Sequence, residues 1–436
     1  MSTAPPIGVP VGLPAPVPGT AVDPTAPARP APSGRREAAA RALSGTPGRM
    51  RIAAALAVLG ALIFGLLGGS AFQAWGSALD DARTNAAQLV RIQTIQNDLV
   101  KADATAATNY LTGGSKTVPN QALYDQAITE ASRRLAQPSP SADTAALEQV
   151  VEGLTRYTAL VAQAQVNNRF GLQVGAAYQR QAGEVLRSQI VPALEQVSAA
   201  DQRRVSAAYD AANGATVRLI ASAVVALVLL LGTQLWLARR THRVINLPLA
   251  VATLAVLAAT LGGWAALNNA AGVARTVASG SYASAVSMAS ARTAAFDAKA
   301  QEAFGLIARG NAKAAEDIAV KRIATAEANL KAGKAADEST LNFTAWVKAH
   351  GAVRAADDKG SWVAARDLAL TTSTEVFNAF DQASKSELDG HAATVEGELG
   401  SARTSLIIMG WLVLACGLVA AGAAYTGFSQ RLGEYR

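Results

Sequence analysis

Four long hydrophobic runs alternate with more polar segments along the chain. Each holds 19 or more consecutive residues without Asp, Glu, Lys or Arg, and they cover residues 52–75, 219–237, 247–267 and 406–428. As a helix rising about 1.5 Å per residue, each run is long enough to cross a hydrocarbon core of roughly 30 Å. Buried helices of soluble proteins are apolar over shorter stretches, so the pattern predicts four transmembrane helices.

Between the first two runs, apolar residues recur at spacings of three and four, which is typical of helices packed in a bundle. One such seam, in a helix over 77–112, contains Ile92, Ile95, Leu99, Ala102 and Ala106. The most regular seam contains Leu147, Val150, Leu154, Tyr157, Val161 and Ala164. A last helix from Val174 to Asn213, with a kink at Pro192, leads into the second run. The segment is predicted to be an antiparallel four-helix bundle.

The segment between the third and fourth runs repeats this order of elements. We expect helices over 276–308, 312–332, 337–357 and 361–403, separated at Gly310, Gly333 and Gly360. At an offset of 196 residues, small residues of the two segments coincide, as Ala102 with Ala298 and Gly114 with Gly310. The repeated order of span, long helix, two shorter helices, long helix and span predicts a tandem duplication. The fold class is therefore an all-α membrane protein with four transmembrane helices and two extracytoplasmic bundles.

The distribution of arginine predicts the orientation. Arginines lie before the first run, between the second and third, and after the fourth: Arg29, Arg35, Arg36, Arg41, Arg49, Arg51, Arg239, Arg240, Arg243, Arg431 and Arg436. Basic residues collect in cytoplasmic segments, so both termini are expected to be cytoplasmic. The two long segments are nearly neutral, and the formal charge of +7 comes from membrane-flanking arginines. The basic residues therefore fit a lipid bilayer, and nucleic acid is not expected as a partner.

These observations divide the chain into nine parts. They are a disordered Pro/Ala-rich cytoplasmic tail (1–48), transmembrane helix 1 (49–76), extracytoplasmic bundle 1 (77–216), transmembrane helix 2 (217–238), a cytoplasmic link (239–246), transmembrane helix 3 (247–268), extracytoplasmic bundle 2 (269–404), transmembrane helix 4 (405–428) and a cytoplasmic end (429–436).

No constellation of residues indicates catalysis. The histidines, His242, His350 and His391, have no partner at metal-ligand spacing, and Cys416 is the only cysteine. We expect no catalytic residue, no cofactor and no metal site. The apolar runs contain no ionisable residue of the kind that transport usually requires. Small residues such as Gly68 in these runs indicate close helix contacts, and a homo-oligomer is left open.

One segment, NNRFGLQVGAAYQRQA at 167–182, departs from the helical pattern. One interpretation is a helix N-terminus capped by Asn167 or Asn168. The other is a contact surface for a partner, in which glycines allow close approach and larger side chains act as anchors. The candidate interface residues are Asn168, Arg169, Gly171, Gly175, Tyr178 and Arg180.

This segment, the order of spans and bundles, and the Pro-rich tail resemble the GlnX family of actinobacterial four-span membrane proteins. The resemblance extends from about residue 51 to the end, although Gln173 stands where the family pattern has proline after Leu172. It implies a relay from an extracytoplasmic amino-acid-binding lipoprotein of the glutamine-binding type to a soluble cytoplasmic serine/threonine kinase.

The residues themselves favour a non-enzymatic transmembrane signal transducer, because helical bundles continuous with membrane helices are typical of sensors. A scaffolding protein of the cell envelope is the alternative, and a channel formed on oligomerisation is a third. The small cytoplasmic portion makes the link a candidate output site, with Arg239, Arg240, His242 and Arg243 as its residues.

Overall fold

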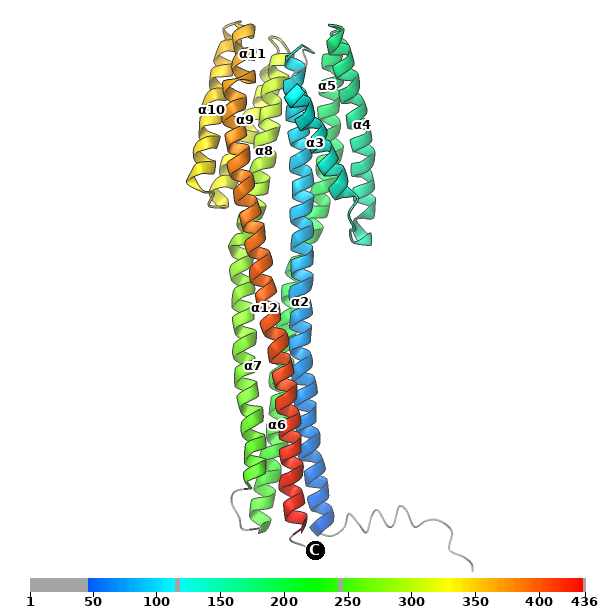
Figure 1. Cartoon of the computed structure of the whole chain (residues 1–436), viewed down its shortest axis with the longest axis vertical. Helices are drawn as coiled ribbons and strands as arrows, with labels where there is room; N and C mark the ends of the chain where they lie inside the picture. The colour runs from blue at the N-terminus through cyan, green and yellow to red at the C-terminus, as the bar shows by residue number, and fades with distance from the viewer. Residues whose placement is uncertain (1–45, 114–117, 242–245, 434–436) are drawn as a thin grey trace, which may run out of the picture.

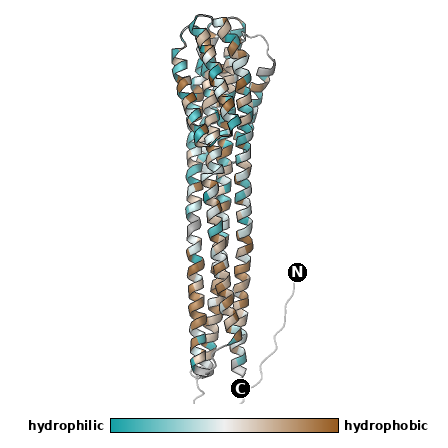
Figure 2. Ribbon diagram, turned by 90° about the vertical axis from the view of Figure 1, so that its left-hand side faces the viewer, coloured by the Kyte–Doolittle hydropathy of each residue, from teal (hydrophilic) through white to brown (hydrophobic). Residues whose placement is uncertain are grey.

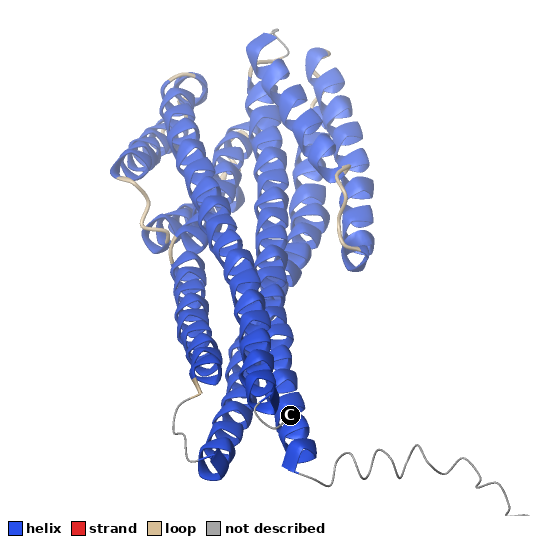
Figure 3. Ribbon diagram, turned by 60° about the horizontal axis from the view of Figure 1, so that its bottom comes forward, coloured by secondary structure: helices blue, strands red, loops and turns tan. Residues whose placement is uncertain are grey.

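The computed structural model describes residues 46–113, 118–241 and 246–433, and within these ranges the chain is helical with short turns and no strand (Figure 3). The helices are α2 (Thr46–Leu111), α3 (Val118–Leu135), the 3-10 turn η1 (Ser141–Asp143), α4 (Thr144–Arg169), α5 (Val174–Val185), the π-helical turn η2 (Leu186–Ile190), α6 (Val191–Thr241), α7 (Leu247–Ser279), α8 (Ser281–Ile307), α9 (Lys313–Ala332), α10 (Asp337–Asp358), α11 (Trp362–Leu370) and α12 (Thr372–Gly433).

Four long helices, α2, α6, α7 and α12, run side by side along one half of an elongated molecule (Figure 1). The shorter helices gather around their extensions at the other end, which we call the distal region. It consists of an N-half, from residues 77–216, and a C-half, from residues 269–404. Helix α2 alone has 66 residues, which corresponds to a length of about 100 Å.

The four long helices are long and apolar enough to cross a membrane, and their most apolar windows have mean hydropathies of 1.8 to 2.4. Only 28 to 39% of each window is buried inside the protein. Large apolar side chains such as Leu66, Leu254 and Trp411, each more than 60% exposed, therefore point outward. Figure 2 shows this apolar zone at the end opposite the distal region. The chain is a multi-pass membrane protein, which confirms the prediction of four spans.

Glycines bring two of the spans into close contact. A Cβ atom added to Gly417 on α12 would lie 2.5 Å from the Cα of Gly65 on α2, so the two backbones meet there. Gly68 and Gly263 are also packed against neighbouring helices, whereas Gly422 faces open space. The small residues of the spans thus serve, in part, contacts within the chain itself.

Most predicted helix ends in the distal region are confirmed. Gly310 and Gly360 adopt positive φ angles of 87° and 75° just after α8 and α10, a conformation that glycine adopts without a steric penalty. The expected helix over 276–308 is instead interrupted at Gly280. The residue has φ −105° and ψ −108°, and a Cβ there would lie 2.7 Å from the Thr276 carbonyl oxygen. The expected helix over 361–403 is interrupted in the same way at Thr371, between α11 and α12.

The predicted kink at Pro192 takes the form of a π-helical turn, η2, immediately before the proline. Proline has no backbone N–H, so it cannot donate to the carbonyl oxygen four residues earlier. The wider turn accommodates this loss and rotates the side chains that follow.

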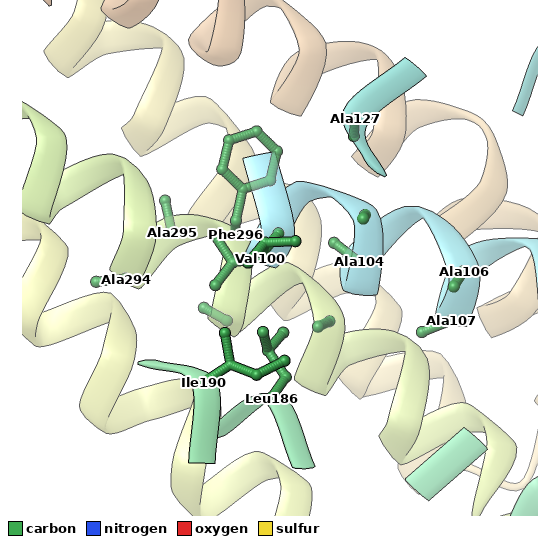
Figure 4. Close-up of a cluster of buried hydrophobic side chains, with 14 of the residues drawn as sticks. Val100, Ala104, Ala106, Ala107, Ala127, Leu186, Ile190, Ala294, Ala295 and Phe296 are labelled. Atoms are coloured by element: carbon green, nitrogen blue, oxygen red, sulfur yellow. The ribbon is translucent and has the colours of Figure 1, made fainter. Parts of the chain in front are cut away.

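The N-half and the C-half share one hydrophobic core. The seam residues of α2 and α4 are buried in it, with Tyr157 and Ile95 fully enclosed. Figure 4 shows Val100 of α2 and Phe296 of α8 side by side, with Leu186 and Ile190 of η2 packed below them. The sequence-based division treated these halves as two bundles, whereas in the structure α2 and α8 join them along a common interface. The tandem duplication stays a prediction.

Candidate functional site

An ion cluster links the two halves at the interface between α2, α8 and α12. The Asp381 carboxylate of α12 pairs with Arg292 of α8 at 2.5 Å and with Lys101 of α2 at 2.7 Å. Arg292 also donates to the Ser384 hydroxyl. Burial alone would raise the pKa of Asp381, but the two cations outweigh it and the pKa is lowered. The carboxylate therefore stays charged and ties α2 to α12.

A second cluster lies on the other face of the α2–α8 pair. Arg187 of η2 lies 3.6 Å from the Asp103 carboxylate of α2 and 3.8 Å from that of Asp297 on α8. Arg322 of α9 pairs with Asp297 at 2.7 Å, and the Tyr157 hydroxyl donates to Asp103 at 3.4 Å. Complete burial raises the pKa of Asp103 to about 7, although Arg187 opposes the shift. Because Arg187 lies beyond hydrogen-bond distance, it offsets only part of the desolvation cost of a charged Asp103 carboxylate.

The C-half contains a tighter buried network. Glu302 of α8 accepts from Lys299 at 2.6 Å and from the Ser373 hydroxyl at 2.9 Å, and it lies 3.0 Å from His350 Nδ1 of α10. Despite burial, these cations hold the pKa of Glu302 at about 2. Burial would lower the pKa of His350, but Glu302 and Glu316 raise it to about 9. Both groups are thus charged at neutral pH.

Two of the three histidines predicted to be without metal partners lie among the described residues, in different surroundings. Within residues 46–113, 118–241 and 246–433, no group of three or more His, Cys, Asp or Glu side chains could hold a metal ion. His350 belongs to the ion network, His391 lies 3.7 Å from Glu387, and His242 lies outside the described residues. These ion clusters can hold the helices in register. Their interactions can also change when a proton or a charged ligand binds, so they can take part in a conformational change.

The segment singled out in the sequence forms the turn between α4 and α5 at the far end of the molecule (Figure 1). The Leu172 N–H donates to the Asn167 carbonyl oxygen, the Gly171 N–H donates to that of Asn168, and Gly171 has φ 68°. This is the Schellman arrangement that ends a helix. The expectation that Asn167 or Asn168 caps a following helix is wrong, because both lie in the last turn of α4, and the Asn168 side chain donates to the Tyr110 carbonyl oxygen.

The six candidate interface residues fall into different environments. Arg169, Gly171 and Arg180 are exposed, whereas Asn168 and Tyr178 are partly covered. Gly175 is buried, and the protein's own Tyr110 hydroxyl would lie 2.9 Å from a Cβ added there. Its small size therefore serves the contact of α5 with α4 and α2.

Sequence reasoning missed the apolar side chains of the same turn. Phe170 is 75% exposed, Leu172 51% and Val174 47%, and they adjoin the exposed Arg169. We call Phe170, Leu172 and Val174 the apolar tip. The sequence RFGLQV could have predicted this exposure. Its three large apolar residues lie around a glycine turn, where no hydrophobic core is available to bury them.

Of the proposed output residues, Arg239 and Arg240 lie in the last turn of α6, where the Arg239 side chain is exposed. His242 and Arg243 lie outside the described residues, as does most of the tail predicted over 1–48.

Comparison with known proteins adds one finding. Residues 78–210 match the family described as an actinobacterial sensor domain. The match covers most of the N-half, from α2 through α6, and less than a third of the 436 residues. No curated protein and no solved structure matches the chain. The N-half is therefore similar to a sensor domain, which indicates a sensing role.

Proposed function

We propose that the chain is a non-enzymatic transmembrane signal transducer that receives an extracytoplasmic signal in the distal region and passes it through its spans to the cytoplasm. The observation that carries this proposal is the continuity of α2 and α12, each a single helix from the apolar zone to the distal region. The sensor-domain match to the N-half supports it. A helix that is continuous through the bilayer transmits a displacement without an intermediate joint.

Contacts between α2 and α12 recur along their whole shared length. Lys101 pairs with Asp381 in the distal region, and Arg83 pairs with Glu396 at 2.5 Å nearer the membrane. Within the spans the backbones meet at Gly417. The exposed ion pair between Arg83 and Glu396 contributes little stability by itself, but it fixes the register of α2 and α12. We infer that α2 and α12 move as one unit relative to α7, whose extension α8 is interrupted at Gly280.

We further propose that the apolar tip receives a protein partner. Its exposed aromatic and aliphatic side chains, flanked by Arg169 and Arg180, have the composition of binding hot spots. An extracytoplasmic solute-binding lipoprotein is the partner that the sequence resemblance implies, and a cytoplasmic serine/threonine kinase is the implied recipient. We place the output at the link that contains Arg240 and Arg243.

The partner proposal is tested by pull-down from cell-envelope extracts with the full chain as bait. Phe170→Asp combined with Leu172→Asp should abolish capture of the lipoprotein, because charges would replace the apolar anchors. Val151→Asp is the control, since Val151 is an exposed apolar residue of the neighbouring helix α4, 52% exposed, outside the tip. Equal capture by the tip variant and wild type would rule out the tip as the docking site.

The relay is tested by phosphorylation of the kinase substrates in cells with and without the gene. Ligand addition should change phosphorylation only when the chain is present, whereas a scaffold would leave the ligand response intact.

The orientation is tested on intact cells with an impermeant thiol reagent. Cysteines at the exposed positions Ser141 and Thr340 should react, and one at the exposed Ser429 should not. Reversed labelling would contradict the proposed topology.

A further inference from the structure

A cleft of about 260 Å³ lies between the two halves of the distal region. Helices α2 and α6 of the N-half form one side, and α8 and α9 of the C-half form the other. It adjoins a smaller inner cavity of about 40 Å³ that reaches Arg187, Asp103 and the π-helical turn η2. Such turns are frequent at functional sites. A movement of the N-half relative to the C-half would therefore change the shape of the cleft.

Buried polar atoms in this cleft have no partner. The Gln93 Oε1 and Ser198 Oγ atoms make no hydrogen bond, and their residues are only 7% and 9% exposed. Gln96 is 8% exposed and lines both cavities. An unpartnered polar atom away from water costs roughly 1–3 kcal/mol, so a folded chain normally satisfies it. Both atoms expose less than 1 Å², but their residues line the cleft, so a side-chain rotation would let a solute there supply the missing hydrogen bonds.

The charges of the cleft indicate which solute fits. Glu195 of α6 contributes a carboxylate with no ion pair among the described residues. Arg322 of α9 lines the cleft from the C-half, and its Nε atom lies 2.7 Å from the Asp297 carboxylate. A guanidinium carries several N–H donors, so Arg322 can bind a second carboxylate beside that of Asp297. An anion and a cation on different walls, with amide and hydroxyl groups between them, match a ligand that carries both charges.

We infer that the cleft binds a small zwitterion with one carboxylate and one ammonium group, the chemistry of a free amino acid. Arg322 binds the carboxylate, Glu195 binds the ammonium group, and Gln93 and Ser198 hydrogen-bond the remainder. At about 260 Å³, the cleft is large enough to admit a free amino acid. The use of this site as a signal input rests on the proposed function, whereas binding itself does not.

Binding is tested with the full chain in detergent, by calorimetry and thermal unfolding, against the twenty proteinogenic L-amino acids one at a time. At least one should bind and raise Tm. Its amide, which lacks the carboxylate, and its N-acetyl form, which lacks the ammonium group, should bind at least tenfold more weakly. Glycerol and glucose serve as uncharged polar probes. Absence of binding by all twenty would overturn the inference, and so would equal binding of the blocked forms or of the uncharged probes.

Variants test the assignment of residues. Glu195→Gln should weaken binding at least tenfold, whereas Glu184→Gln, at an exposed glutamate of α5 outside the cleft, should not. Ser198→Ala should weaken binding yet leave the ligand-free Tm unchanged or higher, because its hydroxyl has no partner to lose. A purely structural serine would give a lower Tm and unchanged binding. Wild-type affinity in both Glu195→Gln and Ser198→Ala would overturn the site.

The two proposals fail separately. Signalling without amino-acid binding would overturn the zwitterion site and leave the proposed function intact. Amino-acid binding in a chain whose deletion leaves kinase signalling unchanged would leave the site intact and overturn the signalling role.

Discussion

The buried pair of His350 and Glu302 makes a quantitative prediction for the pH dependence of stability. The pKa of His350 is raised to about 9 in the folded chain, against an ordinary value of 6.5. At 1.36 kcal/mol per pKa unit, the protonated histidine stabilises the fold by about 3 kcal/mol. Because the folded pKa is the higher one, this stability is fully present below pH 6.5 and is lost as the pH rises through about 9.

The measurement is the free energy of unfolding of the full chain in detergent between pH 7.5 and 9.5. This window lies above the pKa of Asp103, about 7, so the remaining titration of that carboxyl changes the stability much less than that of His350 does. Wild type should lose about 2 kcal/mol more than His350→Gln across it. The ring centroids of Trp346 and His350 lie 5.8 Å apart, so a variant that keeps Trp346 as its only tryptophan can follow the transition at this site by fluorescence.

Lys348→Gln is the matched control, because it removes a positive charge from the exposed side of the same helix. It should keep the wild-type pH dependence. Identical loss of stability in wild type and His350→Gln would refute the assignment of a charged, buried histidine.

Three further predictions concern the bundle core, the span contacts and the output. Leu154→Asp should destabilise the distal region by several kcal/mol, because Leu154 is only 8% exposed and belongs to the hydrophobic core; wild-type melting would refute its burial. Gly417→Leu should cost about 1–3 kcal/mol of stability in lipid nanodiscs, because α2 and α12 meet there. Gly422→Leu is the control, since a Cβ at Gly422 would have nothing within 4 Å, and equal Tm values for the two variants would contradict the contact. Replacing Arg240 and Arg243 together by Gln should leave insertion intact and abolish the kinase response; a normal response in a correctly inserted variant would exclude the link as the output.

The helices and their buried faces were largely predictable from the sequence. Spacings of three and four place Ile95 and Tyr157 on the buried side of α2 and α4, because the helical period brings those positions onto one face. Glycine breaks such as Gly310 were equally predictable, since a positive φ strongly favours that residue. The Gly280 interruption was not, because nothing in the local pattern distinguishes it from a glycine tolerated inside a helix.

The candidate sites were only partly predictable. The segment around Gly171 could be recognised as a departure from the helical pattern, but it was interpreted as a helix N-terminus, whereas the structure has a C-terminal cap there. The clusters around Asp381 and Asp103 could not, because their partners come from helices far apart in the chain. Lys101 and Asp381 are separated by 280 residues, and which cation meets which carboxylate depends on how α2, α8 and α12 pack.

The local properties of the chain followed from its residues alone: four uncharged stretches long enough to span a bilayer, helical seams, and turns at glycine and proline. Each of these follows from the chemistry of neighbouring residues and the fixed geometry of a helix. The packing of α2 against α8 became known only from the folded chain, in which the two halves share one core and line a polar cleft beside the unpartnered Gln93 and Ser198 atoms. The physical reason is that an apolar helix face specifies burial but not a partner, whereas side-chain shape and charge across the interface select one packing among several.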